Sequence, residues 1–186
     1  NDAISLADVT GDFDLTLTGG AASAITLDGA DVDALALTAG GALTLNGDVE
    51  SDGALDFTDV GAISLGGAVA ITGQDSDAAN AKKNITFDSA NVITGAQTLS
   101  LVGDTVTLHQ VGDGTTDPTS LTVTAGTSLS LNGNLTVDGA VALDANVAAI
   151  ALAANSVIDA SGGSNDAISL ADVTGDFDLT LTGGAA

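Results

Sequence analysis

The sequence predicts an all-β fold, a parallel β-helix or β-solenoid, in which the chain winds through stacked coils of short strands. Three observations predict it: apolar and polar residues alternate in short segments along the chain, a long segment occurs twice, and nearly all apolar residues are small and aliphatic. Alternation with a period of two, broken by Gly, Asn and Asp, is typical of short strands joined by turns. We expect residues 1–186 to form one continuous solenoid segment.

A segment of 22 residues occurs twice in this chain. Residues 1–22, NDAISLADVTGDFDLTLTGGAA, return unchanged as residues 165–186. The sequence therefore holds one complete period, residues 1–164, and the beginning of the next copy, residues 165–186. Because a repeated unit is the sequence signature of an array, we predict a long tandem-repeat protein. We also expect the second copy to occupy the same position on the solenoid as the first.

A shorter period becomes visible when apolar-x-apolar triplets are marked. Eight intervals separate the triplet at Ile4 from its copy at Ile168, and their average length is about 20.5 residues. The nine triplets begin at Ile4, Ile25, Leu43, Ile63, Ile85, Val106, Leu129, Ile150 and Ile168. We predict that each triplet opens one coil of this average length, and that all nine stack in one column.

Each coil is expected to contain three short strands. In the most regular stretch, residues 129–143, three pairs of apolar residues alternate with Ser130, Thr136 and Ala142, and Gly133 and Gly139 lie near the expected corners. This pattern predicts a roughly triangular coil with its aliphatic residues inside. Such a unit depends on the coils above and below to cover its apolar interior.

Two segments lack the alternation and are predicted to be loop excursions at the corners. Residues 74–84 (QDSDAANAKKN) contain both lysines, and residues 112–120 (GDGTTDPTS) contain the only proline. Loops on a rigid scaffold are favoured places for recognition, although loops of this size also occur without a function.

The composition excludes several classes of partner. The chain has 25 acidic residues against two lysines, and a formal net charge of −23. Nucleic acids and anionic membrane surfaces bind clustered Lys and Arg, so neither is expected. The most apolar stretch, residues 147–154, is far shorter than the roughly 20 residues of a membrane-spanning helix, so we expect no membrane insertion. The absence of cysteine excludes disulfides and thiolate metal sites.

Several segments resemble a known group of proteins. Residues 35–47 (LALTAGGALTLNG), 121–126 (LTVTAG) and 156–163 (SVIDASGG) are similar to the repeats of filamentous-haemagglutinin-type exoproteins and related autotransporter passengers. These are large bacterial surface proteins. The resemblance implies a right-handed parallel β-helix, export, attachment and an extracellular or cell-surface location. It carries over no functional residue.

Four acidic residues form a candidate metal site. Asp48, Glu50 and Asp52 alternate with other residues, Gly53 stands at the sixth place and Asp59 at the twelfth, which loosely matches calcium-binding loops. The helices that flank such loops are missing, so a solvated acidic corner explains the same residues. We expect the chain to require no cofactor, and Ca²⁺ is the ion that the pattern favours.

A broader form of the calcium hypothesis uses acids in successive coils. We expect the first coil to place its acids near those of the second, where like charges cost stability unless they are screened or bridged. These acids are Asp8, Asp12 and Asp14 in the first coil, and Asp28, Asp31 and Asp33 in the second. A structural Ca²⁺ between coils would relieve the repulsion.

The middle residues of the triplets predict a small, uncharged lateral-contact face. They are Ser5, Thr26, Thr44, Ser64, Thr86, Thr107 and Ser130, and a column dominated by alanine, including Ala3, Ala24, Ala42, Ala62 and Ala149, flanks them. Hydroxyl ladders or lateral packing between fibres explain this pattern, with ice binding as an alternative.

No residue stands out as catalytic. His109 is the only histidine, and no nucleophile, base partner or second ligand is marked out near it. We therefore expect a non-enzymatic, structural or adhesive fibre or stalk segment. Its expected partners are copies of itself, end to end and laterally, and host, surface or matrix ligands. The alternatives are a Ca²⁺-stabilised or ice-binding solenoid and a polysaccharide-active β-helix enzyme.

Overall fold

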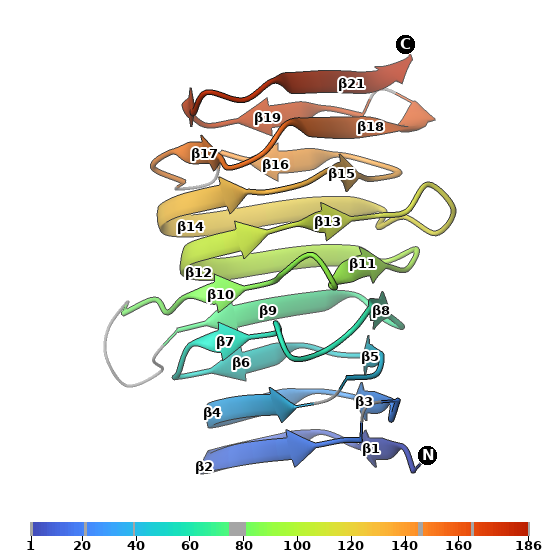
Figure 1. The fold of residues 1–186 in the computed structure, drawn as a ribbon, viewed down its shortest axis with the longest axis vertical. Coiled ribbons are helices and arrows are strands. Elements are labelled where there is room, and N and C mark those ends of the chain that lie inside the picture. The colour runs from blue at the N-terminus through green and yellow to red at the C-terminus, as the bar shows by residue number, and fades with distance from the viewer. Residues whose placement is uncertain are drawn as a thin grey trace.

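The computed structural model describes residues 2–20, 22–38, 40–74, 81–144, 147–164 and 166–185. Within these ranges the chain contains no helix and is 58% strand, wound as a parallel β-solenoid of about eight turns. Figure 1 shows the coils stacked from the N-terminus at one end to the C-terminus at the other. The predicted fold class is therefore confirmed, although the spacing is roughly 22 residues per coil rather than 20.5.

One flat sheet forms the first face of the solenoid, here called face 1. Its nine strands pair in parallel, one from each coil. They are β1 (Ile4–Leu6), β3 (Ile25–Leu27), β5 (Leu43–Leu45), β8 (Ile63–Leu65), β11 (Val92–Thr94), β13 (Gln110–Val111), β15 (Leu135–Thr136), β18 (Ser156–Ser164) and β21 (Leu179–Ala185).

A second sheet, which bends around a corner, forms the other two faces. Four coils have a single bent strand that crosses both faces. These strands are β2 (Val9–Thr18), β4 (Ala30–Thr38), β12 (Thr98–Leu108) and β14 (Ser120–Leu131). In the other coils each face has its own short strand. Face 2 adds β6 (Val49–Ser51), β9 (Val69–Gly73), β16 (Val141–Leu143) and β19 (Ile168–Leu170), and face 3 adds β7 (Leu55–Asp56), β10 (Ile85–Thr86), β17 (Ile150–Leu152) and β20 (Val173–Thr174). Each full coil thus has the three predicted segments.

The long strands turn the corner through irregularities in pairing. The register between β2 and β4 shifts between Gly11 and Asp14 of β2. The register between β12 and β14 shifts between Gly103 and Thr105 of β12. An extra residue on one strand bends that strand and increases its twist, so these shifts let one strand serve two faces.

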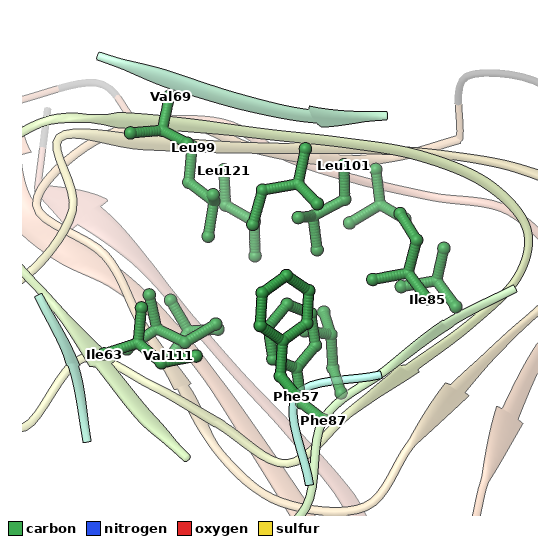
Figure 2. Packing of buried hydrophobic residues seen from close by; sticks show 14 of the residues in the cluster. Phe57, Ile63, Val69, Ile85, Phe87, Leu99, Leu101, Val111 and Leu121 are labelled. Atoms are coloured by element: carbon green, nitrogen blue, oxygen red, sulfur yellow. The ribbon is translucent and has the colours of Figure 1, made fainter. Parts of the chain in front are cut away.

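Aliphatic side chains from all three faces fill the interior. Figure 2 shows Val69, Leu99 and Leu121 of face 2, Ile85 of face 3 and Val111 of face 1 pointing toward the same space. Each of these five residues is at most 3% exposed. The sequence-based assignment of a narrow, layered aliphatic core therefore agrees with the packing.

Two phenylalanines form the bulkiest part of this core. Phe57 and Phe87 follow β7 and β10 in neighbouring coils, and their rings stack with centroids 4.9 Å apart and an angle of 8° between planes (Figure 2). The buried amide of Asn91 supports the backbone beside them. Its nitrogen lies 3.0 Å from the carbonyl oxygen of Phe57 and 2.9 Å from that of Val60, while its oxygen accepts the Asp88 N–H.

The stacking order differs from the predicted column of nine triplets. The triplets at Ile4, Ile25, Leu43 and Ile63 stack on face 1, as expected. The next residue in that column is Ile93, not Ile85. The triplets at Ile85, Val106, Leu129 and Ile150 lie on face 3, and that at Ile168 lies on face 2. The prediction of one column is therefore wrong after the fourth coil.

The cause is one long coil, which runs from Ile63 to its register partner Ile93 and exceeds every earlier step of the column. The segment 74–84 is added to a complete coil instead of replacing part of one. Within it, Gln74 and Lys82 form an isolated antiparallel bridge, and residues 75–80 lie outside the described residues. The other excursion, residues 112–120, connects β13 with the start of β14.

The two copies of the 22-residue segment occupy different faces. In the first copy, β1 lies on face 1 and β2 crosses faces 2 and 3. In the second copy, β19 lies on face 2, β20 on face 3 and β21 on face 1. The expectation that both copies occupy the same position on the solenoid is therefore wrong. The repeat unit, residues 1–164, does not contain a whole number of coils.

Close stacking at the corners leads to the first prediction. A Cβ atom on Gly47 would lie 1.9 Å from the carbonyl oxygen of Asp28 in the preceding coil. We expect Gly47→Ala to destabilise the fold by about 1–3 kcal/mol, the usual cost of overpacking. Urea unfolding followed by circular dichroism measures this change.

The matched control is Gly183→Ala, because the nearest atom to its added Cβ is 3.7 Å away. This variant should stay within about 0.5 kcal/mol of the parent, as most unconstrained surface changes do. Equal effects of the two substitutions would contradict the close corner packing.

Candidate functional site

A hollow lined by acidic side chains lies where face 2 meets face 3 in the first three coils. Its lining residues are Gly11, Asp12, Asp31, Val32, Asp33, Glu50 and Asp52. Parallel stacking brings these acids together, because Asp31 of β4 is the register partner of Glu50 in β6. The prediction that acids of successive coils lie near one another holds for this part of the chain.

Partial burial and neighbouring negative charges both affect the ionisation of Glu50. Partial burial raises the pKa of Glu50 above its ordinary value of 4.5, and the negative charges of Asp31 and Asp52 raise it further. Each effect penalises the carboxylate form. The hollow is therefore a region of negative potential in which ionised Glu50 opposes folding.

The structure separates the four predicted calcium ligands. Glu50 and Asp52 line the hollow, but Asp48 lies at the corner before β6, where its Oδ1 accepts the Ala70 N–H at 2.7 Å. Asp59 lies in the turn after β7, which the Val60 N–H to Phe57 carbonyl bond closes. In the described ranges, no three histidine, cysteine or acidic side chains are placed so that they could hold a metal ion.

His109 lies at the corner after β12 and contacts its counterpart in the next coil. Its Nε2 is 3.1 Å from the Asn132 Nδ2. With the Asn132 amide as donor, this nitrogen of His109 acts as an acceptor. The contact is a step of a polar ladder at a corner, since His109 and Asn132 follow the register partners Leu108 and Leu131.

A recurring hydrogen bond between coils, at the corners, was not predicted from the sequence. Four side-chain oxygens, each on the residue directly before a strand, accept a backbone N–H from the following coil. The pairs are Asp48 with Ala70, Asn84 with Thr105, Asn134 with Val157 and Asn155 with Asp178. An Asn or Asp before successive strands is the signal that would have revealed it. These side chains extend the ladder of hydrogen bonds beyond the strands.

The predicted lateral-contact column consists of two separate ladders. Ser5, Thr26, Thr44 and Ser64 stack on face 1. Thr86, Thr107 and Ser130 stack on face 3. On face 1 the flanking alanines, Ala3, Ala24, Ala42 and Ala62, are all exposed. The alanine and hydroxyl columns together make an uncharged strip on face 1, which we call the small-residue strip.

Comparisons with protein-family models, curated proteins and solved structures find no match to this chain. The described residues also form no helix of the length and hydropathy that a membrane crossing requires. A functional interpretation therefore rests on the geometry of the solenoid itself.

The raised pKa of Glu50 leads to a prediction about pH. Folding disfavours the ionised form of Glu50 relative to the unfolded chain, because the pKa of Glu50 is raised above 4.5. The stability that protonated Glu50 contributes is therefore fully present below pH 4.5 and is lost as the pH rises through the folded pKa. We expect Glu50→Gln to be more stable than the parent at pH 7, with the difference disappearing below about pH 4. Thermal melts across this pH range measure the effect.

Asp113 provides a control with the opposite sign. The Thr115 hydroxyl, followed by the backbone N–H groups of Thr116 and Thr115, holds the pKa of Asp113 below its ordinary value of 3.8. Asp113→Asn should therefore be less stable than the parent at pH 7, and this deficit should shrink as the pH falls through the folded pKa. If both variants shift in the same direction, the assignment of the two carboxylates is wrong.

Proposed function

We propose that this chain is a segment of a structural or adhesive fibre or stalk, located outside the cell or on its surface and without catalytic activity. The stacking of the coils is the observation that carries the proposal. Leu43 of β5 has register partners in the coils on both sides, Ile25 and Ile63, and is 0% exposed. Each coil is thus completed by the next one.

Repetition suits such an assembly. In a solenoid each coil contacts only its neighbours, so stability increases with the number of coils and length can grow by adding units. The return of residues 1–22 as residues 165–186 extends the stack with a sequence that already forms such coils. A rigid rod of this kind fits the general plan of filamentous-haemagglutinin-type proteins and autotransporter passengers, and host, surface or matrix molecules would be its adhesive ligands.

Lateral contact between copies is the second part of the proposal. With a net charge of −23, two such rods repel each other over most of their surfaces. The small-residue strip carries no charge and no long side chain between β1 and β8, so two rods can approach closely there. Neutral, flat contact along this strip would let fibres associate despite their charge.

Lysine substitutions test the lateral contact. In fibres of the tandem-repeat protein, Thr26→Lys, Thr44→Lys and Ser64→Lys together should abolish bundling and leave the circular dichroism spectrum unchanged. Long charged side chains on the strip would prevent close approach. Electron microscopy counts single and bundled fibres.

The structure offers a matched control on face 3. Thr86, Thr107 and Ser130 form a ladder of the same chemistry and register, so lysines there add the same charge at the same spacing. Bundles should persist in this variant. Loss of bundles in both variants, or in neither, would contradict contact through face 1.

Calcium stabilisation is a second candidate function, favoured by the acidic hollow. Five carboxylates line it, from three successive coils. No three of the described side chains are placed to hold an ion as they stand, so these carboxylates would have to move together around Ca²⁺, which takes oxygen ligands from carboxylates. A bound ion would offset the negative charges that, together with partial burial, raise the pKa of Glu50. The sequence-based set of Asp48, Glu50, Asp52 and Asp59 would then be replaced by the acids of the hollow.

Melting in calcium and in chelator tests this candidate. Calcium at 100 times its dissociation constant should stabilise the fold by about 2.7 kcal/mol relative to chelator. Asp31→Asn combined with Glu50→Gln should remove that response, whereas Asp113→Asn, far along the chain, should keep it. A melting temperature that is identical in calcium and in chelator would rule the candidate out.

A further inference from the structure

We infer that each copy of the repeat unit, residues 1–164, is rotated in a tandem array by one face relative to the copy before it. Every surface feature of the unit would then recur on the three faces in turn. This inference rests on the proposed function, since it needs an array. It specifies how such a fibre displays its surface.

The pairing registers give the rotation directly. The face 1 column runs from Ile4 to Ile158 through seven steps from coil to coil, which use most of the repeat unit. The short remainder carries the chain from Ile158 to Ile168, which is the copy of Ile4 and lies on face 2. One repeat unit therefore makes seven full coils and one of the three faces of an eighth coil.

Three successive segments of the repeat show the same shift. Residues 4–6 lie on face 1, and their copies, residues 168–170, lie on face 2. Residues 9–10 lie on face 2, and residues 173–174 lie on face 3. Residues 15–18 lie on face 3, and residues 179–182 lie on face 1. The whole copy moves by one face without a change of order.

The same residues can turn two different corners of the solenoid. Gly11 turns from face 2 to face 3 with φ of 147°, and its copy Gly175 turns from face 3 to face 1 with φ of 125°. The neighbouring phenylalanines, Phe13 and Phe177, point outward at both corners and are 43% and 47% exposed. Because this corner sequence fits either place, the rotation requires no change of sequence.

The rotation sets a long axial period. With coils about 4.8 Å apart, one unit advances about 35 Å, and three units complete 22 coils and return to the starting face after about 106 Å. The small-residue strip of successive units would then face three directions. Lateral contacts through it would join fibres into a three-dimensional network, not a flat ribbon.

Disulfide trapping in this chain tests the rotation first, because the chain has no native cysteine. Ser169 is the register partner of Ala142 on face 2. The stacking of all nine triplets in one column, in which both copies occupy the same face, would instead place Ser169 beside Ala151. We expect Ala142→Cys with Ser169→Cys to form an intramolecular disulfide, since parallel partners lie at a bridgeable separation of about 4.8 Å.

Ala151→Cys with Ser169→Cys should stay reduced, because Ala151 pairs with Thr174. Ser5→Cys with Thr26→Cys, partners in the first copy, is the positive control. Mass spectrometry of the oxidised chains reads all three variants. A disulfide in the Ala151 variant and none in the Ala142 variant would overturn the inference.

Electron cryomicroscopy of a chain with six tandem units tests the array. A gold label on Thr115→Cys in every unit should give a layer line at about 106 Å as well as one at about 35 Å. A fibre that shows only the shorter spacing would overturn the rotation and leave the fibre proposal standing. Compact particles instead of fibres would refute the proposed function, whereas the disulfide result would still decide the phase of the two copies.

Discussion

Parallel stacking, with each strand about 4.8 Å from its copy in the next coil, is the constraint on which this structure depends. Within the paired strands, each side chain lies over its register partner in the neighbouring coil, so each of these positions must match its column. At the corners the backbones approach so closely that Gly133 has no room for a Cβ, which would lie 2.2 Å from the His109 carbonyl oxygen. Asn and Asp side chains before the strands pair with N–H groups of the following coil where the ladder ends.

The same constraint explains the composition of the core. Small aliphatic residues fit above one another in any order, whereas a large residue needs a matching neighbour. Phe57 therefore stacks on Phe87, and Asn91 holds the adjoining turn through its hydrogen bonds. The other two phenylalanines are left outside, at the corners of the two repeat copies. The two buried aromatic rings of this narrow interior form one stacked pair.

Stacking also determines the electrostatics and, through them, the proposed behaviour of the fibre. Acids at equivalent positions of successive coils are brought together, as Asp31 and Glu50 are. Partial burial raises the pKa of Glu50, and the neighbouring negative charges raise it further. Most of the surface therefore repels other copies. The uncharged strip on face 1 is the part of the described surface on which we base lateral contact. The rotation between copies would spread that strip around the fibre axis.

The sequence by itself determined an all-β parallel solenoid, its three segments per coil, its aliphatic interior and the correct stacking of its first four coils. It also indicated that acids of successive coils would meet. Only the tertiary structure decided which face each later triplet occupies, and it separated Asp48 and Asp59 from Glu50. The physical reason is that apolar-x-apolar triplets fit all three faces equally well. Once residues 74–84 lengthen one coil, only the packing of each strand against its neighbours sets the phase.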